Sequence, residues 1–219
     1  MFRAAVFDLD GTFIDSTDAI IASFFHTFDA LGEPRPPREV LTAGIGHVLE
    51  DQFALYTDTD PFHCTGIYRA YYGTICNEMT TLLPGARETV EQLTQAGLKL
   101  GFATSKQRAF AEQILDYLGV LDFFESRIGP GDVTHPKPHP ECVQRSLDNL
   151  GVQPNECIFV GDTDFDVKAC AAAGVPCIAV TTGYNTRAQL QALSPLAVLD
   201  DLHEVTDLIL ASTRGAVSP

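Results

Sequence analysis

Short, uninterrupted runs of apolar residues recur along the chain and predict buried strands. One such run covers residues 4–7, and three more cover 98–104, 157–162 and 175–180. Strands that are apolar throughout, instead of alternating with polar residues, are typical of a parallel sheet that helices cover on both faces. The pattern therefore predicts an α/β fold with a Rossmann-like, doubly wound parallel sheet as its core.

Segments with apolar residues at helical spacing separate these strands, and each ends at a glycine. The segment 106–118 places Phe110, Ile114 and Leu118 on one face, and Gly119 follows as a stop signal. The same arrangement predicts helices at 85–96, 139–150 and 164–173. Strands that alternate with such helices fit βαβ units, in which consecutive strands run parallel.

One long segment, from about Asp15 to Thr81, breaks this rhythm and predicts an insertion. Three helical patterns follow one another there without a strand between them, at 16–31, 48–56 and 62–79. We therefore predict a small α-helical cap at 15–81, inserted after the first strand of a catalytic core that comprises residues 1–14 and 82–219. A cap at this place would cover the edge of the sheet where ligands bind.

Composition and charge are those of a soluble globular protein and narrow its partners. The formal net charge of 14 − 29 = −15 argues against nucleic acid or an anionic membrane as a partner. No apolar run approaches the roughly 20 residues that span a bilayer, and Asp8 and Asp10 follow the N-terminus too closely for a signal peptide. We expect a cytoplasmic protein in which the six cysteines are reduced and mostly buried.

Chemically distinctive residues follow the first predicted strand, in the sequence Asp8-Leu9-Asp10-Gly11-Thr12. Two carboxylates two positions apart leave a strand in the same direction, and Gly11 allows the backbone to turn sharply. One carboxylate can attack as a nucleophile while the other transfers protons. The alternative interpretation is an acidic turn that caps a helix.

A second position, Thr104 with Ser105 and Lys106 after it, follows the strand at 98–104. A hydroxyl and backbone N–H groups at the start of a helix can bind phosphate. A helix N-cap without a ligand is the alternative for such a residue.

The third position is Lys137, in the sequence His135-Pro136-Lys137-Pro138-His139. Prolines on both sides restrict the backbone, so the ammonium group has a limited range of positions. A fixed cation there could keep Asp8 ionised and neutralise a bound phosphate. We assign the two histidines to the loop and the helix start, and a rigid surface loop is the alternative for the whole segment.

The fourth position is Asp162, at the end of the strand 157–162, with Asp164 and Asp166 in the helix that follows. Asp162 can complete an oxygen-ligated Mg²⁺ site with the first motif, because Mg²⁺ prefers oxygen donors. Asp166, one helical turn on, could orient Lys137 or a metal-bound water. We interpret Asp164 as a solvated acid at the helix start.

The combination of D-x-D-G-T, a strand-ending Thr, K-P-x-P and G-D-x-x-x-D, in this order, resembles the haloacid dehalogenase superfamily of phosphohydrolases over essentially the whole chain. The helical insertion is similar to the small cap of phosphoglycolate phosphatases and their relatives. The chain departs from that subgroup at Phe13, where Leu is commoner, and at Ser105, where Asn is frequent.

The resemblance implies a Mg²⁺-dependent phosphatase that works through a covalent aspartyl-phosphate. Asp8 would be the nucleophile and a metal ligand. Asp10 would be the general acid and base, with its backbone carbonyl on the metal, and Asp162 would also ligate Mg²⁺.

The remaining motif residues would act on the phosphate. Thr104 would bind the transferring phosphoryl group with Ser105 beside it, Lys137 would bridge Asp8 and the phosphate, and Asp166 would be a supporting acid. The expected partner is a small phosphorylated metabolite, and the expected reaction is hydrolysis of a small phosphomonoester similar to 2-phosphoglycolate.

Several alternatives remain, most of them within the superfamily. Inorganic pyrophosphatase is the first, followed by a sugar-phosphate phosphatase or phosphomutase, although the mutases carry a histidine where Ala19-Ile20-Ile21 stand here. A dehalogenase would lack Asp10, and a phosphonate-cleaving relative would need a cap lysine, which is absent between Asp15 and Thr81. A catalytically silent relative, or a signalling receiver domain that is a binding module and not an enzyme, fits less well.

The predicted cap is acidic, with a net charge of 3 − 10 = −7 over residues 15–81. Recognition of a second anionic group on the substrate must therefore rely on few cations or on backbone N–H groups. The stretch Gly44-Ile45-Gly46-His47 precedes a predicted helix and could offer such groups to a small acid such as 2-phosphoglycolate. We predict Gly46 and His47 as substrate-binding residues, with a simple turn as the alternative.

Overall fold

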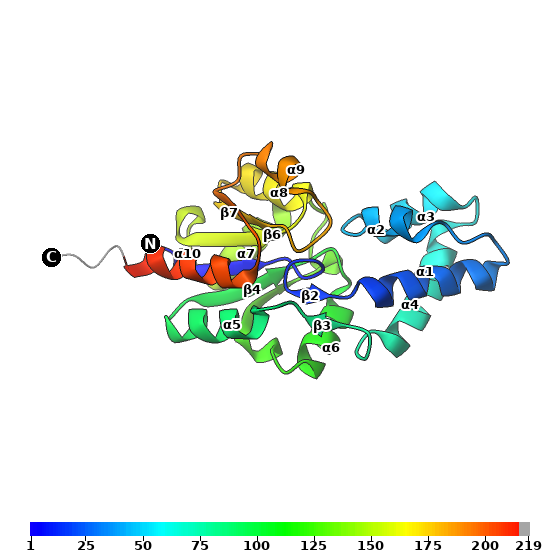
Figure 1. Ribbon diagram of the computed structural model, residues 1–219, viewed down its shortest axis with the longest axis horizontal. Helices are drawn as coiled ribbons and strands as arrows, with labels where there is room; N and C mark the ends of the chain where they lie inside the picture. The colour runs from blue at the N-terminus through cyan, green and yellow to red at the C-terminus, as the bar shows by residue number, and fades with distance from the viewer. Residues whose placement is uncertain (215–219) are drawn as a thin grey trace.

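The computed structural model describes residues 1–214 and contains a central six-stranded sheet whose strands are all parallel (Figure 1). The strands lie in the order β5-β4-β1-β6-β7-β8. In chain order they are β1 (Ala4–Phe7), β4 (Lys99–Ala103), β5 (Phe124–Ile128), β6 (Cys157–Gly161), β7 (Cys177–Val180) and β8 (Ala197–Leu199). The predicted α/β fold with a Rossmann-like, doubly wound parallel sheet is confirmed.

Successive residues of β1 face opposite sides of the sheet and enter two separate hydrophobic clusters. Ala5 and Phe7 share one cluster with residues of α5 (Ala86–Gln95), α6 (Arg108–Tyr117) and α10 (Leu202–Arg214). Ala4 and Val6 share the other with residues of α7 (Glu141–Leu150), α8 (Asp164–Ala173) and α9 (Arg187–Gln191). Because helices cover both faces, every residue of β1 is buried, and this explains the continuous apolar run.

The four predicted strands are present, and the two strands that the pattern missed lie at the edges of the sheet. β5 alternates between buried residues and the more exposed Glu125 and Arg127, so it lacks a continuous apolar run. β8 has only three residues, and all three are partly exposed. Short or half-exposed edge strands give a weak sequence signal.

Four helices extend beyond one end of the sheet (Figure 1) and follow one another between two short strands. The strands β2 (Ile14–Asp15) and β3 (Thr81–Leu82) pair antiparallel, at the junctions that the sequence analysis placed between core and cap. The helices, here called the helical cap, are α1 (Thr17–Leu31), α2 (Arg38–Ala43), α3 (Leu49–Tyr56) and α4 (Pro61–Ile75). The division of the chain into two domains stays a prediction.

Aromatic side chains form the centre of the helical cap. Phe24 of α1 lies against Phe53 of α3 and Tyr68 of α4, with ring centroids 5.0 and 5.1 Å apart. Tyr72, on the turn of α4 after Tyr68, is also buried and stacks on it. The short helix α2, which follows the proline-rich connection, was not predicted.

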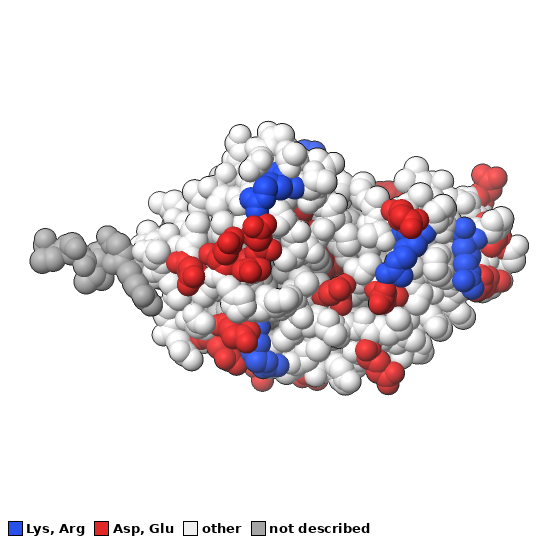
Figure 2. All heavy atoms as spheres, in the orientation of Figure 1, with Lys and Arg blue, Asp and Glu red and all other residues white. Residues whose placement is uncertain are grey.

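The surface and the cysteines agree with the composition. Within residues 1–214, no helix has both the length and the apolar character needed to cross a membrane. All six cysteines are buried free thiols, as predicted. Figure 2 shows acidic side chains on both the sheet region and the helical cap, with basic side chains beside several of them. Arg38 and Asp18 of the helical cap form one such ion pair, at 2.5 Å. Three short 3-10 helices complete the structure, at Leu121–Phe123, Pro130–Asp132 and Pro154–Glu156.

Candidate active site

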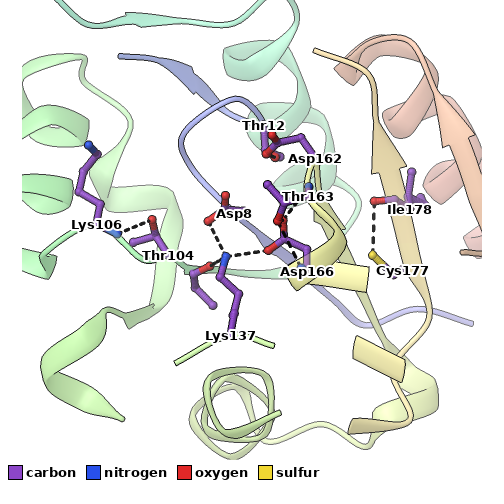
Figure 3. Close-up of polar contacts among 11 residues, drawn as sticks. Asp8, Thr12, Thr104, Lys106, Lys137, Asp162, Thr163, Asp166, Cys177 and Ile178 are labelled. Atoms are coloured by element: carbon purple, nitrogen blue, oxygen red, sulfur yellow. Dashed lines mark hydrogen bonds and ion pairs between the residues drawn. The ribbon is translucent and has the colours of Figure 1, made fainter. Parts of the chain in front are cut away.

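The four chemically distinctive positions predicted from the sequence come together at the carboxyl ends of neighbouring strands (Figure 3). Asp8 follows β1, which lies between β4 and β6 in the sheet. Thr104 follows β4 and Asp162 follows β6, while Lys137 reaches in from the loop between β5 and α7. Such a position, outside the carboxyl ends of the strands, is where open α/β sheets bind their ligands.

Lys137 bridges two acidic side chains at the centre of the site (Figure 3). Its ammonium group donates to Asp8 Oδ1 at 2.9 Å, to Asp166 Oδ1 at 2.6 Å and to the Ala103 carbonyl at 3.3 Å. The Lys137 side chain is only 5% exposed, so solvent screens these charges weakly. Asp166 therefore contacts Lys137 directly, which is one of the two arrangements that the sequence left open.

Burial makes the charged forms of Asp8 and Asp162 unfavourable. Burial is the largest cause of a rise in the pKa of Asp8 to about 7; Lys137 opposes this rise, while Asp166 and Asp10 add to it. The pKa of Asp162 is also raised well above its usual range, by burial first and then by Asp8 and Asp166. A cation bound between these carboxylates would remove both penalties.

The buried carboxylates also fit a metal ion in their geometry and chemistry. One oxygen each of Asp8, Asp162 and Asp166 lie within 4.8 Å of one another, and all three residues are buried. The oxygens of Asp166 already accept from Lys137 and, at 3.0 Å, from the backbone N–H of Thr163. Asp8 and Asp162 are therefore the better placed ligands, and their hard oxygen donors suit Mg²⁺.

Asp162 is held by groups that the sequence analysis did not single out. Thr12 donates its hydroxyl to Oδ1 at 2.8 Å, and the backbone N–H of Tyr184 donates to Oδ2 at 3.1 Å. The loop after β7 approaches so closely that a Cβ on Gly183 would lie 1.8 Å from Asp162 Oδ2. The signal available in the sequence was this glycine, three positions after another predicted apolar strand.

Asp10 has a different set of partners from Asp8. Its Oδ1 accepts a hydrogen bond from the hydroxyl of Ser16 and lies 3.1 Å from the ammonium group of Lys106. Neither Ser16 nor Lys106 was assigned a role from the sequence. The two carboxylates of the D-x-D motif are thus paired with two different lysines, Asp8 with Lys137 and Asp10 with Lys106.

Thr104 is not the N-cap of the helix that follows it, so the helix-cap alternative does not apply to this residue. The N-cap of α6 is Gln107, three positions further on. The Thr104 hydroxyl accepts from the backbone N–H of Lys106 at 3.1 Å (Figure 3) and lies in a turn directly after β4. Its hydroxyl proton can then be donated to a phosphate oxygen, as the resemblance implies.

A cavity of about 510 Å³ lies over these groups, between the helical cap and the sheet. The sheet region contributes Asp8, Asp10, Thr104, Ser105 and Lys137 to its lining, and the helical cap contributes Gly46 and His47 among others. The predicted catalytic and substrate-binding residues thus share one pocket. Asp162 and Asp166 are not in its lining, and both are fully buried.

The cap turn before α3 corrects one detail of the sequence analysis. The N–H groups of Gly44, Ile45 and His47 donate to carbonyls of Leu41, Thr42 and Gly44 within the turn itself. These three donors are engaged and do not form a free cradle for a carboxylate. Gly46 and His47 line the pocket, and their role in binding substrate stays a prediction.

The loop that carries Lys137 is anchored by Glu141. Its carboxylate accepts from the backbone N–H groups of Thr134 at 3.1 Å and His135 at 3.0 Å. The bond from Thr134 is the largest cause that lowers the pKa of Glu141 to about 2. His135 and His139 belong to this loop and to the turn before α7, as the sequence analysis assigned them.

Comparisons with known proteins agree with this geometry. A family model described as haloacid dehalogenase-like hydrolase matches residues 5–180. A pyrophosphatase PpaX from Bacillus cereus (strain AH820) is 32% identical over 213 residues, which cover 97% of this chain and 99% of the relative. A pyrophosphatase PpaX from Bacillus velezensis is 34% identical over 202 residues, which cover 92% and 94% of the two chains.

Solved structures share the fold over nearly the whole chain. A haloacid dehalogenase-like family hydrolase from Streptococcus pneumoniae has a TM-score of 0.86 at 28% identity and covers 95% of this chain and 98% of its own. A structure described as a predicted phosphoglycolate phosphatase from Haemophilus somnus has a TM-score of 0.86 at 26% identity, with the same coverage of the two chains.

A parallel sheet with paired aspartates after its first strand and a buried lysine beside them fits a hydrolase of the phosphatase class. The chain belongs to the haloacid dehalogenase-like hydrolase family. The family predicted from the sequence is therefore confirmed, and so is the prediction of an enzyme that hydrolyses phosphate compounds.

Proposed function

We propose that this enzyme is a Mg²⁺-dependent phosphatase that transfers the phosphoryl group of a small phosphorylated metabolite to Asp8 and then to water. The observation that carries the proposal is the position of Asp8. Its carboxylate lines the pocket, contacts the ammonium group of Lys137 at 2.9 Å and has Asp162 within 4.8 Å for a shared metal ion.

The first step is attack on phosphorus. A carboxylate oxygen of Asp8 forms a bond to phosphorus while the bond from phosphorus to the leaving oxygen breaks, and Asp10 gives its proton to that oxygen. Lys137 neutralises charge on the phosphoryl oxygens and Thr104 donates its hydroxyl to one of them. Mg²⁺, which Asp8, Asp162 and the backbone carbonyl of Asp10 would hold, supplies positive charge against the repulsion between carboxylate and phosphate.

The second step releases phosphate. Asp10, now ionised, takes a proton from water as the water oxygen bonds to phosphorus, and the bond between phosphorus and Asp8 breaks. This restores the Asp8 carboxylate and the proton on Asp10. Because the helical cap forms one wall of the pocket, it limits the access of bulk water during the first step.

Pyrophosphate is the first candidate substrate and 2-phosphoglycolate the second. The relatives named pyrophosphatase support the first, because they align with this chain over nearly its full length. The solved structure described as a phosphoglycolate phosphatase supports the second. Both substrates are small, and both carry a second anionic group beside the phosphoryl group that is transferred.

A turnover panel with Mg²⁺ tests this proposal. It compares pyrophosphate, 2-phosphoglycolate, a hexose phosphate and a nucleoside monophosphate, with release of inorganic phosphate as the measurement. We expect the highest kcat/KM for one of the two small substrates that carry a second anionic group. Faster turnover of the hexose phosphate or the nucleotide would overturn the proposed substrate class, and no phosphate release from any compound would overturn the proposed function.

A further inference from the structure

Lys106 is a buried lysine in the pocket to which neither the sequence analysis nor the proposed mechanism assigns a role. It lies in the loop between β4 and α6, and its side chain is 6% exposed. Its ammonium group donates to the hydroxyl of Tyr72 at 2.7 Å and lies 3.1 Å from Asp10 Oδ1. Tyr72 belongs to α4, so Lys106 connects the helical cap to the proposed acid and base.

The ammonium group of Lys106 stays charged in this environment. Burial disfavours the charge, but the Asp10 carboxylate and the hydroxyls of Tyr72 and Tyr68 outweigh burial and raise the pKa of Lys106 above its usual range. The ammonium group also lies 4.6 Å from the centre of the Tyr72 ring, which adds a cation–π contact. A fixed positive charge thus stands beside Asp10 at neutral pH.

The other cations that line the pocket are held by acidic residues other than the proposed general acid. Lys137 lies between Asp8 and Asp166. Arg69 pairs with Glu50 at 3.0 Å, and Arg108 pairs with Asp132 at 2.7 Å. Among the described residues that line the pocket, Lys106 is the lysine that contacts the proposed general acid, Asp10.

The position of Lys106 relative to the leaving group follows from the role of Asp10. The leaving group must lie next to Asp10, because Asp10 gives its proton to the leaving oxygen. Lys106 lines the pocket at this point, 3.1 Å from Asp10 Oδ1. An ammonium group has three N–H donors, so besides the Tyr72 hydroxyl and the Asp10 carboxylate one donor is left for an anionic group on the leaving group.

We propose that Lys106 binds the negative charge of the leaving group and thereby selects substrates whose leaving group is anionic. This inference rests on the proposed function. The second phosphate of pyrophosphate and the carboxylate of 2-phosphoglycolate both meet the requirement, whereas a neutral alcohol does not.

A matched pair of substrates tests the proposal. In 2-phosphoglycolate and ethyl phosphate the leaving groups differ only by a carboxylate in place of a methyl group, so ethyl phosphate is the control whose leaving group carries no charged substituent. A charge-assisted hydrogen bond contributes about 10- to 100-fold in kcat/KM. We expect Lys106→Met to lower kcat/KM for 2-phosphoglycolate and pyrophosphate by about that factor more than for ethyl phosphate.

Three further variants make the result decisive. Lys106→Arg keeps the charge and should retain part of the preference for anionic leaving groups. Tyr72→Phe removes only the hydroxyl that holds the ammonium group, so it should lower the preference in the same direction even if Lys106→Met fails to fold. Arg108→Met removes another pocket cation. It should change kcat/KM by similar factors for 2-phosphoglycolate and for ethyl phosphate.

Two outcomes separate this inference from the proposed function. The inference would be overturned if Lys106→Met and Tyr72→Phe each lowered kcat/KM by the same factor for 2-phosphoglycolate and for ethyl phosphate. Lys106 would then act only through Asp10. A wild-type enzyme that releases no phosphate from any of these substrates would overturn the proposed function instead.

Discussion

Replacement of Asp8 by Asn is expected to lower turnover of every phosphorylated substrate by at least about 10⁴-fold while the protein still folds. Asn has nearly the same size and shape, but its amide cannot form the acyl phosphate. Lys137 keeps its second acidic partner, Asp166, at 2.6 Å, so the lysine remains in place. Phosphate release at saturating substrate and Mg²⁺, with circular dichroism as the check on folding, measures the effect.

The stability of Asp8→Asn provides an internal control. Because burial and Asp166 disfavour the charged form of Asp8, we expect the metal-free variant to have a Tm equal to or above that of the metal-free wild type. Asp164→Asn is the matched substitution, since Asp164 lies on the same sheet edge but forms an exposed ion pair with Lys168. It should leave turnover unchanged, and turnover near the wild-type level by folded Asp8→Asn would contradict a covalent role for Asp8.

Removal of Mg²⁺ with a chelator is expected to abolish activity, because three buried carboxylates and the substrate phosphate would then repel one another. The same repulsion predicts a thermal effect that does not depend on turnover. Added Mg²⁺ should raise the Tm of the metal-free protein, and a free concentration 100-fold above the dissociation constant corresponds to about 2.7 kcal/mol of stabilisation.

Two comparisons identify the site of that ion. Asp162→Asn removes a proposed ligand, so the rise in Tm on addition of Mg²⁺ should be much smaller than in the wild type. Ca²⁺ is larger and less strict in its geometry, so it should raise the Tm without supporting comparable turnover. Full activity after dialysis into excess chelator would show that the acidic cluster does not need a metal.

The core of the site could be predicted because each residue is attached to a strong local signal. Asp8, Thr104 and Asp162 each follow a continuous apolar strand, and parallel strands bring their carboxyl ends to one edge of the sheet. Lys137 lies between two prolines, which marked its loop as rigid. The prediction that the strands are parallel was therefore enough to place the residues that follow them at one edge of the sheet.

The remainder of the site depends on contacts that no local pattern encodes. Lys106 meets Tyr72, 34 positions away, only because α4 packs beside the sheet edge in this orientation. The loop after β7 reaches Asp162 through the backbone N–H of Tyr184, which any residue but proline could supply. The structure was also needed to show that N–H groups of the Gly44–His47 turn are hydrogen-bonded within the turn. The sequence of a glycine-rich turn is the same whether its N–H groups are free or bonded.

The central claim is that the phosphoryl group passes through Asp8, and trapping the phosphoenzyme tests it most directly. In Asp10→Asn the nucleophile remains, but hydrolysis of the acyl phosphate lacks its base. Brief reaction of this variant with p-nitrophenyl phosphate and Mg²⁺, followed by a rapid acid quench and peptide mass spectrometry, should place one phosphoryl group on Asp8. A phosphoryl group on Asp162 or Ser105, or turnover with no phosphorylated enzyme at any quench time, would contradict the account.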